Sequence, residues 1–290
     1  MSAPGPVLRF APSPNGELHL GHALSALVDF RMAQRLGGTF LVRIEDIDVE
    51  RCRPEFVAGI LEDLDWLGIR WQEPVERQSQ HFPDYQAAAQ RLDEQGLLFP
   101  CFATRSEIER SANPDARDPD GALLYPGIHR GLSATEIAER KARKEPFALR
   151  IDMRRAVERA REILNGAPLS FVELTDNGRT ERMLARPERW GDAVLVRKDV
   201  PASYHLSVVV DDARQRVTHV TRGLDLLPST DIHRLLQVLL GLPEPLYHHH
   251  RLITDATGRK LAKSAHDTSL AALRARGATP ADIRRMVGLD

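Results

Sequence analysis

Apolar and polar positions in the N-terminal third form patterns of strands and helices in turn. A short apolar run, Val7 to Ala11, ends at a turn rich in proline, and a helical period of apolar residues then continues to Gly37-Gly38. An apolar, β-branched run from Thr39 to Ile44 predicts a second strand, and Pro54 to Leu67 a second helix. Strand, helix, strand, helix predicts a parallel sheet, with ligands beyond the carboxyl ends of its strands.

The middle of the chain has a less regular pattern. A helix is predicted between Phe82 and Gly96, and a second helix begins at Ser133, where Ser133 and Glu136 form a capping box. Ser111 to Ala122, rich in Asp, Pro, Asn and Gly, is expected to be a mobile surface loop. Three further runs are typical of strands, namely Phe147 to Met153, Phe171 to Leu174 and Ala193 to Lys198. This mixture predicts an insertion.

The last third returns to the first pattern. It predicts a helix from Tyr204, a strand from Val217 to Thr221, a helix from Ser229 to Leu240 and a short helix from Pro280 to Val287. These elements would complete the parallel sheet. We therefore expect an α/β fold in three segments, with the inserted subdomain at 97–190 between the sheet halves 1–96 and 191–290.

Composition and charge narrow the classes of protein. The 290 residues are 42% hydrophobic, enough for a core, and the net charge of -1 leaves nucleic-acid contacts to local patches. Two distant cysteines indicate a reducing compartment. The N-terminus lacks a signal-peptide pattern, and no apolar run is long enough to cross a bilayer. We expect a cytoplasmic monomer without membrane segments.

Two histidines follow the first predicted strand and its turn, Pro12 to Gly16. His19 and His22 are three residues apart, so on a helix they share a face near its N-terminus, where N–H groups and the helix dipole favour a phosphate. A bare H-x-x-H is more typical of helix-capping histidines, and that alternative stays open. The proline-rich turn favours nucleotide binding, and Gly21 would let the nucleotide approach the backbone.

A lysine-bearing segment, Gly258 to Ser264, lies near the C-terminus. Lysines in a polar loop are typical of a solvated surface, but with the histidines they predict one site that closes on a triphosphate. The triplet His248 to His250 is expected to form a loop leading into this segment and not a metal site. The predicted catalytic residues are His19, His22, Lys260 and Lys263, and the predicted ATP-binding residues are His19, Gly21, His22 and Lys263.

Further segments complete a recognisable series: Arg9 to Pro14, Arg43 to Asp48, and Val208 to Asp212 with Arg222-Gly223. Together with the histidine and lysine segments, which match the signatures known as HIGH and KMSKS, they resemble the glutamyl branch of class I aminoacyl-tRNA synthetases. The resemblance runs from about Arg9 to Ser264. It implies a Rossmann-type parallel-sheet catalytic domain with an inserted acceptor-binding-like α+β subdomain.

The same resemblance implies an enzyme that activates L-glutamate with ATP, with Mg²⁺ as the partner of ATP. Glu45 is assigned to the α-ammonium group of glutamate and the arginines to its carboxylates. A solvated turn or a salt bridge remains the alternative for Glu45, and a half-buried core aromatic for Tyr204. The implied glutamate-binding residues are Arg9, Phe10, Ala11, Pro12, Ser13, Glu45, Tyr204 and Arg222.

The tRNA acceptor is inferred from length as well. After Ser264 only 290 − 264 = 26 residues remain, so we expect no anticodon-binding domain. Truncated members of this branch attach glutamate to queuosine, the modified wobble base of tRNA(Asp), instead of to a 3′ end. The resemblance therefore implies the anticodon loop of tRNA(Asp) as the partner.

A zinc site of the family is altered here. Relatives often carry a Cys-x-Cys pair and a later Tyr-x3-Cys, and the corresponding residues are Cys101, Ala103, Tyr125 and His129. Structural zinc takes four N or S ligands. We expect no zinc, although these residues leave a weak site open.

Three other functions remain open. The chain could be a conventional tRNA(Glu) ligase without its anticodon domain, a non-catalytic RNA-binding paralogue, or a small-molecule nucleotidyltransferase of the same fold. Intact histidine and lysine segments argue against the RNA-binding paralogue.

Overall fold

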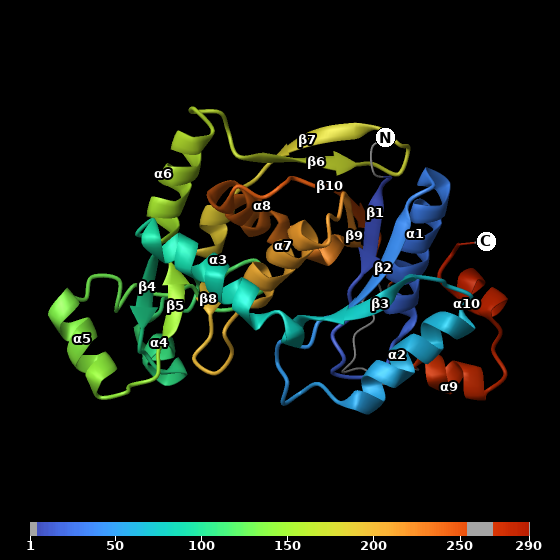
Figure 1. Ribbon diagram of the computed structural model, residues 1–290, viewed down its shortest axis with the longest axis horizontal. Helices are drawn as coiled ribbons and strands as arrows, with labels where there is room; N and C mark the ends of the chain where they lie inside the picture. The colour runs from blue at the N-terminus through green and yellow to red at the C-terminus, as the bar shows by residue number, and fades with distance from the viewer. Residues whose placement is uncertain (1–4, 254–268, 290) are drawn as a thin grey trace.

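The computed structural model describes residues 5–253 and 269–289, arranged as Figure 1 shows. One half of the main sheet consists of β1 (Val7–Phe10), β2 (Thr39–Ile44) and β3 (Gln72–Arg77), which run parallel in that order. Helix α1 (Leu20–Leu36) connects β1 to β2, and α2 (Pro54–Trp66) connects β2 to β3. The predicted alternation of strand and helix is confirmed.

The other half of the main sheet contains β9 (His219–Gly223), β10 (Leu246–His250) and β6 (Ser170–Leu174), all parallel, with β7 (Thr180–Leu184) antiparallel at the edge. By strand pairing the two halves are separate sheets. They adjoin where the backbone N–H of Thr218 donates to the carbonyl of Val7 at 2.9 Å, so β9 begins beside β1 and the two together form the main sheet. The carboxyl ends of β1, β2, β9 and β10 therefore lie at one edge, where ligands of such sheets bind.

Helices cover this sheet and connect its halves. Helices α3 (Phe82–Glu94), α7 (Tyr204–Arg214) and α8 (Ser229–Leu240) pack against one another. Near the C-terminus, α9 (Leu270–Ala275) contacts α2, and α10 (Pro280–Met286) contacts α1, as the red and blue helices of Figure 1 show. Within residues 5–253 and 269–289, no helix has the length and apolar character to cross a membrane.

A second, smaller sheet lies to the left in Figure 1, away from β1 to β3. It consists of β4 (Leu98–Cys101), β5 (Ala148–Ile151) and β8 (Val194–Val196), with antiparallel pairing. Helices α4 (Arg105–Ser111) and α5 (Ala134–Ala142) lie in the segment between β4 and β5. The capping box predicted at the start of α5 is confirmed, because the side chains and backbones of Ser133 and Glu136 hydrogen-bond reciprocally.

Two features of the middle segment differ from the predictions. Helix α6 (Met153–Ile163) was not predicted, although its buried positions, Met153, Ala156 and Ala160, follow a helical spacing and make the helix strongly amphipathic. Strand β6 falls within 97–190 but pairs with β10 of the main sheet. The division into three segments stays a prediction.

The histidine triplet was wrongly predicted to be a loop. It forms the end of β10, with His248 and His250 buried and His249 opposite Arg222 of β9. The Nδ1 atom of His248 lies 2.7 Å from the carbonyl of Leu174, which fixes the ring against β6. Three consecutive imidazoles carry no alternation of apolar and polar residues, so nothing local in the sequence indicates this strand.

Candidate active site

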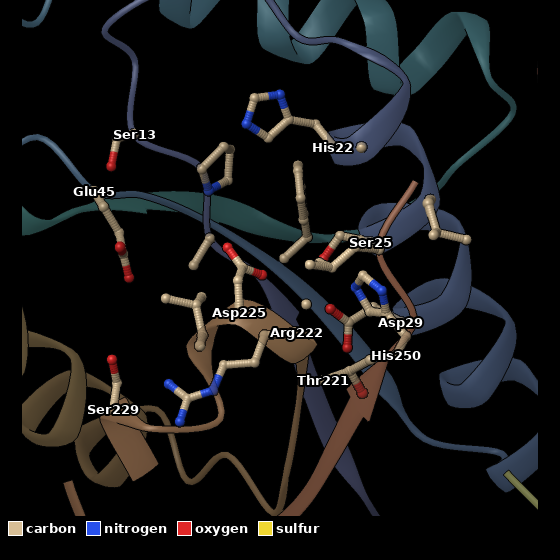
Figure 2. A pocket seen from close by; sticks show the side chains of 18 of the residues that line it. Ser13, His22, Ser25, Asp29, Glu45, Thr221, Arg222, Asp225, Ser229 and His250 are labelled. Carbon is tan, nitrogen blue, oxygen red and sulfur yellow. The ribbon is translucent and has the colours of Figure 1, made fainter. Parts of the chain in front are cut away.

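A pocket of about 570 Å³ opens at the carboxyl ends of β1, β2, β9 and β10, within the size range of small-molecule sites. Figure 2 shows the carboxylate of Glu45 and the guanidinium of Arg222 on one side of it and the imidazole of His22 at its upper edge. Lys260 and Lys263 lie outside the described residues. All other predicted site residues line the pocket: Arg9, Phe10, Ala11, Pro12, Ser13, His19, Gly21, His22, Glu45, Tyr204 and Arg222.

The histidines lie at the N-terminus of α1. His19 is the N-cap residue, and its Nδ1 accepts from the backbone N–H of Gly21 at 3.0 Å, while Nδ1 of His22 accepts from the N–H of His19 at 3.2 Å. The rings stack at 3.9 Å between centroids. A Cβ at Gly21 would approach the His19 ring to 2.9 Å, so glycine accommodates this cap.

These contacts are those of helix-capping histidines, the alternative that the sequence left open. They also fix the chemistry of the rings, because a neutral imidazole that accepts at Nδ1 carries its proton at Nε2. Both Nε2 groups are then donors at a helix N-terminus, where anions bind favourably. Capping and phosphate binding are thus compatible in His19 and His22.

Behind the pocket, one carboxylate holds two buried arginines. Asp212 on α7 accepts from Nε of Arg9 at 3.0 Å and from Nη1 of Arg43 at 2.8 Å. Nη2 of Arg43 donates to Oε1 of Glu45 at 3.1 Å. Arg9 is therefore already paired with a carboxylate, whereas Glu45 shares its arginine with Asp212 and retains acceptor capacity toward the pocket.

The charges of this cluster oppose the cost of burial. Burial raises the pKa of Asp212, but the guanidinium groups of Arg9 and Arg43 outweigh it and leave the pKa below its usual value. Burial likewise raises the pKa of Glu45, and Arg43 only partly offsets this. A positively charged ligand would therefore stabilise the ionised form of Glu45.

Arg222 has a different environment. It is 4% exposed, and its guanidinium donates to four neutral acceptors: Thr230 Oγ1 at 2.6 Å, His233 Nδ1 at 3.1 Å, His249 Nε2 at 3.2 Å and Tyr204 Oη at 3.5 Å. Among residues 5–253 and 269–289, no carboxylate forms an ion pair with it. A buried charge without a counter-charge is costly, so this side of the pocket favours an anionic ligand.

Several pocket residues were missed by the sequence analysis. Asp29 of α1 is 0% exposed, and its two carboxylate oxygens make no hydrogen bond of ordinary geometry within the described structure; burial raises its pKa well above the usual value. Asp120 comes from the predicted surface loop, which is a turn closed by hydrogen bonds between Asp118 and Ala122. No local pattern distinguishes these carboxylates from solvated ones. The pocket lining includes further residues that were not predicted, namely Ser25, Thr221, Asp225, Ser229 and His250.

The altered zinc residues form a hydrogen-bonded group. His129 Nδ1 accepts from the backbone N–H groups of Phe102 and Ala103, each at 3.2 Å, and Tyr125 Oη accepts from the N–H of His129 at 2.9 Å. Cys101 Sγ lies 3.4 Å from Tyr125 Oη. Because Nδ1 of His129 accepts from the backbone, the neutral ring carries its proton at Nε2 and offers no lone pair to a metal. The group therefore does not fit a tetrahedral zinc site. The expected absence of zinc stays a prediction.

The site brings a helix N-terminus, a buried carboxylate and a buried arginine together at one edge of a parallel sheet. This arrangement is that of a Rossmann-like enzyme with a small-molecule pocket at the carboxyl edge of its sheet. The chain belongs to the family described as tRNA synthetases class I (E and Q), catalytic domain, which matches residues 7–289. It is therefore an enzyme of the ligase class.

Individual relatives agree with this family. The chain is 46% identical to the Glutamyl-Q tRNA(Asp) synthetase of Rhodobacter capsulatus over 98% of this chain and 100% of that protein. It is 38% identical to the Glutamate--tRNA ligase of Prochlorococcus marinus, covering 94% of this chain but 55% of the relative. Among solved structures, the glutamate-tRNA synthetase of Elizabethkingia anophelis matches with a TM-score of 0.76 at 26% identity, covering 98% of this chain and 61% of that one.

Proposed function

We propose that the protein activates L-glutamate with MgATP to glutamyl-adenylate and transfers the glutamate to the queuosine base of tRNA(Asp). The observation that supports the amino acid is the buried guanidinium of Arg222, which meets only neutral acceptors within the described chain. The γ-carboxylate of glutamate would supply the missing counter-charge. An amide in its place would leave the charge poorly compensated.

The rest of the amino acid fits the neighbouring groups. Glu45, a buried carboxylate that shares Arg43 with Asp212, would accept from the α-ammonium group. Arg9 uses Nε and Nη2 for Asp212 and Nη1 for the carbonyl of Thr221, so part of its five N–H groups can reach the α-carboxylate together with Ser13. The α-carboxylate would then lie between the arginines and the N-terminus of α1.

Activation is an in-line displacement at the α-phosphorus of ATP. An oxygen of the glutamate α-carboxylate forms the new P–O bond, and the bond to pyrophosphate breaks. The N-terminus of α1 with the Nε2 groups of His19 and His22 would bind the phosphates. Lys260 and Lys263 are proposed to neutralise the leaving pyrophosphate, and catalysis rests on positioning and charge stabilisation.

The acceptor is proposed from the relatives. The Rhodobacter capsulatus protein bears the name Glutamyl-Q tRNA(Asp) synthetase and matches this chain along its whole length. Residues 97–190, the predicted inserted subdomain, would contact the RNA. Incubation with labelled glutamate, ATP and tRNA(Asp), with and without queuosine, tests this assignment.

Removal of the 3′-terminal adenosine of the tRNA before its glutamylation sharpens the experiment, because it takes away the ribose hydroxyls that accept an amino acid at the 3′ end and leaves queuosine intact. If it is followed by isolation of the anticodon fragment, label should appear only in queuosine-containing RNA and in that fragment. Equal labelling of queuosine-free tRNA would contradict the proposed acceptor.

A conventional tRNA(Glu) ligase is the second candidate, favoured by the 38% identity to the Prochlorococcus marinus Glutamate--tRNA ligase. Such an enzyme would label tRNA(Glu) at its 3′ end. Removal of the 3′-terminal adenosine of tRNA(Glu) would then abolish labelling, and queuosine in tRNA(Asp) would have no effect.

A further inference from the structure

Arg222 is held from two sides by imidazole rings. On β10, His249 lies directly opposite Arg222 in the strand register, and its Nε2 accepts from Nε of the arginine at 3.2 Å. On α8, His233 Nδ1 accepts from Nη1 at 3.1 Å. Because arginine only donates, both of these imidazole nitrogens must be unprotonated acceptors.

Each imidazole is in turn fixed by a further residue. With Nε2 accepting, His249 carries its proton at Nδ1, which lies 2.8 Å from Oε2 of Glu173, while Oε1 of Glu173 accepts from the backbone N–H of His249 at 2.7 Å. With Nδ1 accepting, His233 carries its proton at Nε2, which lies 3.2 Å from Nδ1 of His205. The tautomers of His249 and His233 therefore follow from Arg222, which can only donate.

Burial keeps these rings neutral. The side chain of His249 is 1% exposed and His233 is 3% exposed. Burial lowers the pKa of His249 and, with the nearby Arg222, holds the pKa of His233 well below its usual value. The rings therefore orient the guanidinium without cancelling its charge, which a carboxylate in direct contact would do.

We propose that His249 and His233 are positioning residues that aim Arg222 at the side-chain carboxylate of the substrate, and that Glu173 sets the tautomer of His249. This inference rests on the proposed function and assigns its selectivity for an anionic amino acid to a frame of neutral imidazoles. Glu173 acts on Arg222 only through His249, and its strand, β6, does not line the pocket.

The substitution Glu173→Gln tests the tautomer directly. Glutamine has the same shape, but whichever way its amide points, one NH₂ group faces either the N–H of His249 or its protonated Nδ1. In pyrophosphate exchange, we expect the KM for glutamate to rise roughly 10 to 100-fold with the KM for ATP unchanged. Glu181→Gln is the matched control. Glu181 is exposed, lies opposite Glu173 in the register of β7, and its substitution should leave both KM values unchanged.

A pair of variants tests the other imidazole. His233→Asn keeps a carbonyl oxygen near the position of Nδ1 and should retain most of the affinity for glutamate. His233→Leu fills the space without an acceptor, and the KM for glutamate should rise at least roughly 10-fold. Equal effects of the two variants would overturn the role of the imidazole as an acceptor.

The coupling between Glu173 and Arg222 separates positioning from general stability. If Glu173 acts through Arg222, adding Glu173→Gln to Arg222→Gln should cause no further loss in kcat/KM for glutamate, whereas independent effects would multiply. A glutamate-specific enzyme with an unchanged KM in Glu173→Gln and His233→Leu would overturn this inference and leave the proposed function intact. An unmodified protein without glutamate-dependent exchange would overturn both.

Discussion

Arg9 and Asp212 are 203 residues apart in the sequence and form an ion pair at 3.0 Å, with both side chains largely buried. Arg9 belongs to β1 and Asp212 to α7, so the contact joins the first strand to a helix of the last third of the chain. Arg43 of β2 shares the same carboxylate. Asp212 thus fixes the relative positions of two strands whose carboxyl ends form the pocket.

Loss of this shared carboxylate should destabilise the protein strongly. Asp212→Asn leaves Arg9 and Arg43 buried without their common counter-charge, and breaking a buried pair costs about 3–5 kcal/mol. We expect the free energy of unfolding, measured in urea, to fall by about that amount. Asp199→Asn is the control, since Asp199 pairs with Arg197 at an exposed position and should change stability little. Equal losses in both variants would contradict the account.

Acid should destabilise the fold through its buried histidines. Burial lowers the pKa of His205 from 6.5 to about 4. The unfolded chain takes up this proton as the pH falls below 6.5, while the folded chain does so only near 4. The stability that this group contributes is therefore complete above pH 6.5 and is lost progressively between 6.5 and about 4.

The matching measurement is the slope of unfolding free energy against pH between 6.5 and 4.5. In His205→Gln that slope should be smaller than in the unmodified protein, by up to about 1.4 kcal/mol per pH unit for one proton. Identical slopes would show that His205 titrates alike in both states.

The proposed role of Lys263, a residue outside the described part of the chain, can be tested by substitution. If its ammonium group neutralises charge that develops on the pyrophosphate, Lys263→Ala should lower the rate of exchange by about 10² to 10³. Lys141→Ala, an exposed lysine of α5, is the control and should have no effect. An unchanged rate in Lys263→Ala would remove this residue from the mechanism.

The altered cysteine region predicts a metal-free protein. His129, Tyr125 and Cys101 already bond to one another or to the backbone. We expect elemental analysis of the purified protein to find far less than one zinc per chain, and a chelator to leave the midpoint of thermal unfolding unchanged. One zinc per chain, or a lower midpoint with the chelator, would contradict this.

Much of the main sheet could be predicted because its signals are local. The apolar run Val7 to Ala11, its proline-rich turn and the glycine pair after α1 each specify a boundary, and α8 was predicted with its observed bounds, Ser229 to Leu240. Strand β10 was missed because its residues, Leu246 to His250, become a strand through pairing with β9 and β6 and not through an apolar pattern.

The site shows the same division. The predicted site residues that the structure describes do line one pocket, whereas Lys260 and Lys263 lie outside the described residues. The imidazoles around Arg222 were not predicted, because His205, His233 and His249 are far apart in sequence and each alone is typical of a buried core histidine. Asp29 was missed for a similar reason, since a carboxylate in the middle of a helix is usually solvated.

We expect Arg222 to make the pocket select a carboxylate, and amino-acid-dependent ATP–pyrophosphate exchange measures this selectivity. Glutamate should support exchange, glutamine should be poorer by a factor on the order of 10⁴, and aspartate, one methylene shorter, should lose roughly 10 to 200-fold. Arg222→Gln should abolish the preference for glutamate over glutamine. Exchange with glutamine as fast as with glutamate, or exchange that needs no amino acid, would show that Arg222 does not select a carboxylate.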